Sequence, residues 1–231
     1  MKKFLIAILL FAFFSNSSKA QGRDVVIYKQ SWDKQPVFWG YFLGINKKDF
    51  KITYTEENTF IDVTANVGFE VGLIGDLRLH NNINLRLEPG LSSNTKELAF
   101  THIPGGKKDS IRDVNATYLR IPLLLKFSAN RYYNIRPYVV GGFSYDYNFS
   151  SNQDNPNDNY DGEFRSKKNN FSYEIGIGMD VYLPNFIFSP SIRGVFAIND
   201  EMVRDGNPNS PWTGKVDYFG TRGVFIKFAF H

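Results

Sequence analysis

The sequence predicts an all-β fold, an eight-stranded antiparallel transmembrane β-barrel that is closed and has a lumen filled with polar side chains. Three observations favour this fold. Apolar and polar residues alternate in about eight segments, the charged residues of these segments keep to one parity, and long connections alternate with short ones. The apolar parity would then face lipid and the charged parity the lumen.

Each predicted strand is a run in which every second residue is apolar or aromatic. In chain order, these outward-facing series run from Trp39 to Ile45, Phe69 to Leu77, Ile83 to Leu91, Leu119 to Phe127, Val139 to Tyr147, Phe171 to Val181, Phe186 to Phe196 and Val224 to Phe230. Strands of about 9 to 13 residues are long enough to cross a membrane at a tilt.

The opposite parity carries charges of both signs. We expect these structural lumen charges to be Glu70, Asp76, Arg86, Glu88, Arg120, Lys126, Arg136, Glu174, Asp180, Arg193 and Lys227; Arg78 and Asp146 share their parity. An Arg or Lys that faced lipid at mid-bilayer would cost about 2–4 kcal/mol. Buried charges need partners, so we interpret this set as a salt-bridged plug, with a proton or ligand path through the lumen as the alternative.

Strand periodicity alone also fits a soluble barrel or sandwich whose apolar parity lies inside. The N-terminus favours the membrane protein. Lys2 and Lys3 precede an apolar run from Phe4 to Phe14, and Ser18-Lys19-Ala20 suits cleavage before Gln21. This pattern is typical of a secretory signal peptide, because the apolar run has about half the length that a retained membrane anchor needs. Without cysteine, the chain can be neither a lipoprotein nor a disulfide-linked protein.

The connections predict the topology. The long ones are Lys47 to Val67, about Asn94 to Asn115, Ser150 to Asn169 and Asn199 to Phe219, and the short ones are His80 to Asn82, Ser128 to Asn134 and Pro184-Asn185. Outer-membrane barrels have long loops outside and short turns in the periplasm. We therefore expect four extracellular loops and two periplasmic termini in the outer membrane of a Gram-negative bacterium.

This topology divides the chain into a signal peptide (residues 1–20), a periplasmic N-terminal segment (21–37) and one barrel domain (38–231). The middle segment would either dock on the barrel floor or remain a disordered leader.

Composition argues against several function classes. The formal net charge of +4 falls to about +1 when Lys2, Lys3 and Lys19 leave with the signal peptide, so no nucleic-acid partner is implied. The histidines are His80, His102 and His231, and none lies beside a plausible serine nucleophile. We expect no enzyme, no cofactor and no small-molecule substrate, with a lipid-modifying enzyme as the weakest alternative.

Two of the predicted loops contain features that are typical of binding sites. Asn157 to Gly162 places oxygen ligands at the first, third and fifth positions with glycine at the sixth, as in a calcium loop, but Lys168 stands where a bidentate Glu is needed. We therefore expect no metal site. Trp212, in a proline-rich loop, would be an interfacial anchor or a partner contact.

Five segments carry a family resemblance. They are WGYFLGIN at residues 39–46 followed by Asp49-Phe50, GLIGDLRL at 72–79, NLRLEPGL at 84–91, YLRIPLLLKF at 118–127 and IRPYVVGG at 135–142. In these segments, and over nearly the whole mature chain, the protein resembles the PorT-like, also called SprT-like, outer-membrane barrels of the Bacteroidota. That family is associated with type IX protein secretion and, in gliding species, with motility.

The resemblance implies a non-catalytic accessory component of the type IX secretion system, with outer-membrane lipid and other secretion components as partners and no catalytic residues to transfer. An eight-stranded interior is far too narrow for a folded cargo protein, so the contribution would come from assembly or scaffolding. The alternative is a general surface barrel whose loops bind ligands or adhere to other surfaces.

Overall fold

Ten strand segments form the wall of a barrel in the computed structural model, which describes residues 26–32, 35–55, 61–101, 103, 110–155, 164–207 and 210–231. They are β1 (Val37–Tyr54), β2 (Ile61–Ala65), β3 (Val67–His80), β4 (Ile83–Leu87), β5 (Gly90–Phe100), β6 (Ile111–Ser128), β7 (Ile135–Asn148), β8 (Asn169–Tyr182), β9 (Ile187–Ala197) and β10 (Val216–Phe230). No helix within the described residues is long and apolar enough to cross a membrane.

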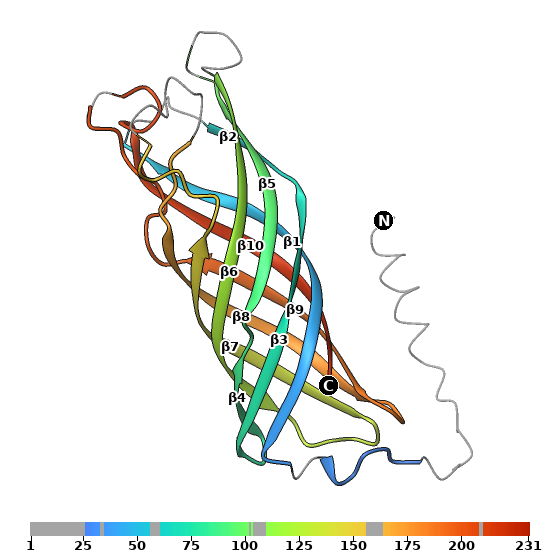
Figure 1. Cartoon of the computed structure of the whole chain (residues 1–231). Coiled ribbons are helices and arrows are strands. Elements are labelled where there is room, and N and C mark those ends of the chain that lie inside the picture. Colours follow the sequence, from blue (N-terminus) through green and yellow to red (C-terminus); the bar gives the residue numbers. More distant parts are fainter. Residues whose placement is uncertain are drawn as a thin grey trace, which may run out of the picture.

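The segments form a closed ring of eight antiparallel strands, as the sequence predicts (Figure 1). β2 and β3 are successive parts of one wall strand, separated by Asn66, and β4 and β5 are parts of another, separated by Glu88 and Pro89. Each wall strand pairs with its neighbours in the chain, and β1 closes the ring by pairing with both β10 and β3. The closing register matches Tyr41 with Phe230.

The two faces of this wall have opposite polarity. Apolar side chains such as Trp39 and Phe143 are exposed on the outside, at 76% and 68%, whereas Arg86 and Arg120 are buried inside at 0% and 1%. A water-soluble barrel would have the reverse arrangement, so the prediction of a membrane-type barrel is confirmed.

One aromatic side chain also fills the interior. Phe42 is fully buried, and a Cβ atom at Gly72 or Gly90 would lie 2.6 or 2.9 Å from its ring. Gly72 is the cross-strand partner of Phe42, and Gly90 pairs with Gly72 on the next strand, so the absence of side chains at these two positions leaves room for the ring.

The strands extend further than predicted at the end that carries the long loops, which we call the long-loop end. The predicted connections Lys47 to Val67 and Asn94 to Asn115 are wrong in their bounds, because β1 continues to Tyr54, β2 forms, β5 continues to Phe100 and β6 begins at Ile111. The alternation persists there with inverted polarity. On β1, for example, Phe50 is buried whereas Lys51 is exposed, as in a soluble β-protein.

The inverted part of the barrel has a hydrophobic core of its own, which we call the cap core. It consists of Phe50, Ile61, Leu98, Phe100, Val114, Phe164, Met202, Val216 and Phe219. The rings of Phe50 and Phe219 lie 4.2 Å apart, and Phe164 lies 5.0 Å from Phe219. Two sheets, β1 with β10 and β2 with β5 and β6, thus pack together beyond the apolar band (Figure 1).

The opposite end of the barrel carries the short turns, and part of the N-terminal segment contacts it. Asn134, in the β6–β7 turn, accepts a hydrogen bond from the Tyr28 amide (2.9 Å) and donates one to the Val26 carbonyl (2.8 Å). Arg131 of the same turn donates to the Tyr28 carbonyl. β1 begins on the other side of the ring from this turn, so residues 26–32 contact the barrel at a distance from the start of β1. The predicted signal peptide lies outside the described residues.

Candidate functional site

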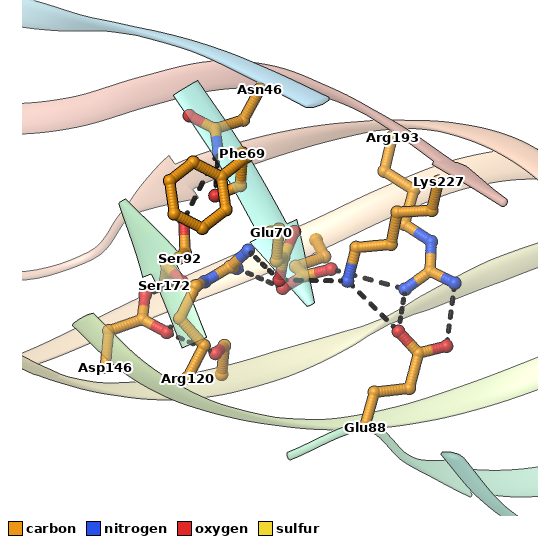
Figure 2. A network of polar contacts seen from close by, with 12 residues as sticks. Asn46, Phe69, Glu70, Glu88, Ser92, Arg120, Asp146, Ser172, Arg193 and Lys227 are labelled. Atoms are coloured by element: carbon orange, nitrogen blue, oxygen red, sulfur yellow. Dashed lines mark hydrogen bonds and ion pairs between the residues drawn. The ribbon is translucent and has the colours of Figure 1, made fainter. Parts of the chain in front are cut away.

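The interior of the barrel holds the main concentration of charge, and Arg120 of β6 is one of its centres (Figure 2). Its guanidinium group contacts three carboxylates from three other strands: Glu70 at 3.2 Å, Asp146 at 3.1 Å, and Glu174. Its fourth neighbour is the Phe225 ring, whose centroid lies 4.5 Å away. The planar group with its several donors thus joins β3, β6, β7 and β8 across the lumen.

Glu88 is the second centre, and it lies at the interruption between β4 and β5. Arg193 donates to both of its carboxylate oxygens, at 2.7 and 2.8 Å, and Lys227 approaches one of them at 3.1 Å (Figure 2). Arg86 lies 3.5 Å from the same carboxylate. Because Lys227 also lies 3.2 Å from Glu70, the two centres form one network.

A third group of charges lies toward the short-turn end. Asp76 accepts hydrogen bonds from Arg86 (2.9 Å) and from Asn84 (2.6 Å), and Lys126 contacts Asp180 at 2.6 Å. Arg86 connects this group to Glu88. We call the whole set the interior ion network: Glu70, Asp76, Arg86, Glu88, Arg120, Lys126, Asp146, Glu174, Asp180, Arg193 and Lys227.

The structure thus brings together all of the residues proposed from sequence as lumen charges except Arg136. The side chain of Arg136 lies at the short-turn rim, where it donates hydrogen bonds to the carbonyls of Ala129 and Asn81 at 3.0 and 2.5 Å. Arg78 lies at the same rim and donates to Asn81 Oδ1. Both residues have inward parity and stand near the strand ends, and Arg136 also lines a small cavity together with Asp76 and Lys126.

Sequence reasoning missed a second set of buried polar residues nearer the long-loop end. Lys48, Asn94, Lys96, Arg112 and Glu201 are each at most 5% exposed. All five lie in the long connections that the sequence predicts, because the outward apolar series ends before them. Continued alternation on β1, β5 and β6 is the signal that would have found the first four.

Lys96 and Glu201 of this second set have shifted pKa values. Burial lowers the pKa of Lys96 to about 8, against the opposing attraction of Glu201 and Asp49. Burial raises the pKa of Glu201, which the neighbouring Lys96 partly offsets. The Lys96 ammonium lies 3.7 Å from the centre of the Phe50 ring, so part of its charge is compensated by an aromatic face.

The free space within the barrel is small. A cavity of about 30 Å³ is lined by Asp76, Arg86, Lys126 and His231, and another of about 20 Å³ lies beside Lys48, Arg120 and Glu201. Each has room for one or two water molecules. The side chains between them belong to the interior ion network, so the lumen is a packed polar core.

The described residues offer little for metal chemistry. No group of three or more His, Asp or Glu side chains among them is arranged to hold a metal ion. The calcium-like segment from Asn157 to Gly162 and His102 lie outside the described residues.

A closed antiparallel barrel with an apolar outer face and an ion-paired interior is a transmembrane β-barrel of the outer-membrane class. The chain belongs to the family described as the outer membrane protein beta-barrel domain, whose model matches residues 19–203. It is therefore an outer-membrane β-barrel protein.

Several solved structures are similar to this chain. The outer membrane protein OprG from Pseudomonas aeruginosa is 14% identical, with a TM-score of 0.46, over 83% of this chain and 95% of that chain. Neisserial surface protein A is 9% identical (TM-score 0.40, 82% and 95% covered), and Ail of Yersinia pestis is 14% identical (0.36, 85% and 98%). No curated protein sequence matches the chain significantly.

Proposed function

We propose that this barrel is a non-catalytic accessory component of the type IX protein secretion system that supports export across the outer membrane and, where present, gliding motility. The observation that carries the proposal is the packed interior, combined with the resemblance of segments such as residues 72–79 and 118–127 to PorT-like barrels. A barrel without room for cargo contributes through its surfaces, by holding or assembling other secretion components.

In this proposal the interior ion network is structural. It seals the lumen and fixes the wall strands relative to one another, because each buried charge has a partner of opposite sign. No catalytic, cofactor or metal role is assigned to these residues.

We also propose an orientation of the chain in the outer membrane. Residues 1–20 are the cleaved signal peptide, both termini and residues 21–37 lie in the periplasm, and the long loops are extracellular. The contacts of Arg131 and Asn134 with Val26 and Tyr28 support a docked N-terminal segment. That segment is the surface that we assign to periplasmic secretion components.

The test is deletion of the gene followed by complementation, with export of type IX cargo into the medium as the measurement. We expect deletion to abolish export and the wild-type gene to restore it. The Arg131→Ala/Asn134→Ala variant, which releases the docked segment, should restore it poorly, whereas Asn130→Ala at the same turn should restore it fully. Unchanged export in the deletion strain would reject the proposal.

The second candidate is a general surface barrel whose loops bind ligands or adhere to other surfaces. The observation that favours it is the cap core, which holds β1, β2, β5 and β6 beyond the apolar band as a firm support for the loops. Shortening the loops would then abolish adhesion or ligand capture while export of type IX cargo stayed normal.

A further inference from the structure

The closed ring opens into a seam at the long-loop end, between β1 and β2. β1 pairs with β3 only as far as Lys47 and Val67, and beyond this point it pairs with β10 alone. β2 pairs with β5 alone. Residues 48–53 of β1 and 61–65 of β2 therefore present strand edges that face each other without a ladder between them.

The hydrogen bonds identify which backbone groups face the seam. The Phe50 amide donates to its neighbour's side chain, Asp49 Oδ1, at 2.8 Å, and the Ile61 amide donates to the Tyr54 hydroxyl at 2.9 Å. Neither amide is therefore used by the ladders to β10 or β5. Because backbone groups of an antiparallel strand alternate in direction, those of Ile52 and Val63 face the seam as well.

The seam contains a cavity whose inner side is apolar and whose outer side is charged. A cavity of about 310 Å³ lies in it, a volume of a few amino-acid residues, and Ile52, Val63 and Asp62 are among its lining residues. Ile52 and Val63 pack against the cap core, whereas Asp49 and Arg222 form an exposed ion pair on the outer side. An inserted strand would thus meet apolar side chains on one face and charged ones on the other.

We propose that the seam binds an extended segment of a partner polypeptide, which enters as an additional strand between β1 and β2. Backbone donors and acceptors on strand edges that are outside a ladder, such as those of Ile52 and Val63, can bond to an added strand, as in complexes that form by β-strand addition. The alternation of the seam predicts a segment in which apolar residues, directed at the cap core, alternate with polar ones. The inference does not depend on a role in secretion.

The test uses the full mature chain in detergent micelles and amide hydrogen exchange measured by NMR. Without peptide, the amides of Ile52 and Val63 should exchange at least about tenfold faster than those of Lys51 and Thr64, which face β10 and β5. The probe is a fluorescent hexapeptide of alternating threonine and valine. It should bind below about 1 mM and slow exchange at Ile52 and Val63.

A matched control peptide carries N-methyl groups on its valines, which removes half of its backbone donors and should weaken binding about tenfold or more. Val63→Pro removes one donor from the seam edge and should weaken binding about fivefold. If that variant does not fold, the comparison of the two peptides still decides.

Three results would overturn the proposal: no peptide binding, equal binding of both peptides, or protection that appears elsewhere in the barrel. Seam amides that are already protected in a dimer detected by light scattering would overturn it too, since a second copy of the chain would then be the occupant.

Discussion

Glu88 is the residue on which three buried cations converge. Arg193, Lys227 and Arg86 all lie within 3.5 Å of its carboxylate, and its side chain is fully buried. Pro89 follows it and has no backbone N–H, so the ladder lacks one donor there, although the Glu88 amide still donates to the Pro122 carbonyl at 3.2 Å.

Removing the Glu88 charge is expected to be costly, because its cations would remain buried without compensation. Glu88→Gln should lower the free energy of unfolding by about 3–5 kcal/mol, measured by urea titration of the barrel refolded in lipid vesicles. The matched control is Asp49→Asn, which breaks an ion pair with Arg222 whose side chains are 38% and 54% exposed; its effect should stay below about 1 kcal/mol. Equal effects of the two variants would contradict a stabilising network.

Lys96 gives the cap core a dependence on pH. Its pKa is about 8 in the folded chain, below the usual 10.5, so the unfolded chain binds more protons between these values. The contribution of Lys96 to the free energy of unfolding should therefore rise with pH, by about 2 kcal/mol between pH 8 and pH 10. The penalty for burying the charge is fully present below pH 8.

Lys96→Met should reduce the total rise between pH 8 and pH 10 by about that amount in the same urea titrations, whereas Lys51→Met, at an exposed position of β1, should leave the rise unchanged. Above pH 10 the raised pKa values of Tyr54 and Tyr218 act in the opposite direction, so the comparison ends there. A wild-type profile that is flat from pH 8 to pH 10 would contradict the shift.

The strands that extend into the long-loop end, such as β1, have an apolar outward face at one end and a polar outward face at the other. On β1, the outward residues are apolar at Trp39 and Leu43, then polar at Lys51 and Thr53, while the inward residues change in the reverse sense. The sequence therefore predicted the membrane half of each strand well, because charges were absent from one parity over the whole run.

The other half was assigned to loops, since apolar residues no longer kept to the outward parity. The cap core shows why sequence reasoning failed there. Phe50, Leu98, Phe219 and Met202 come together through pairings distant in the chain, which a local pattern does not reveal. The partners of the interior charges were equally out of reach, because Glu88 and Lys227 are 139 residues apart.

A charge placed on the outer face should reveal where lipid ends. Ile177→Arg, at a position 61% exposed on β8, should lower the free energy of unfolding in vesicles by about 2–4 kcal/mol. Thr53→Arg, on the outer face of β1 beyond the apolar band, should change it by less than about 0.5 kcal/mol. Similar costs at both sites would mean that the apolar band does not mark the bilayer.

At the scale of the whole molecule, the packed interior predicts that the barrel does not conduct ions. Purified barrel in planar lipid bilayers should show no stepwise conductance, because buried ion pairs fill the lumen and the two cavities described between them are small. A porin reconstituted in the same bilayers serves as the positive control. Reproducible single-channel steps from the wild-type barrel would show that the network opens.

The closing register has a consequence for biogenesis. The first wall strand finds one of its two partners only in the last residues of the chain, since Leu43 pairs with Phe228. A chain whose terminal strand has not yet paired is therefore an open barrel, and its apolar outward side chains are exposed to water. We therefore expect that a chain in which the terminal strand has not yet paired needs a chaperone to keep it from aggregating.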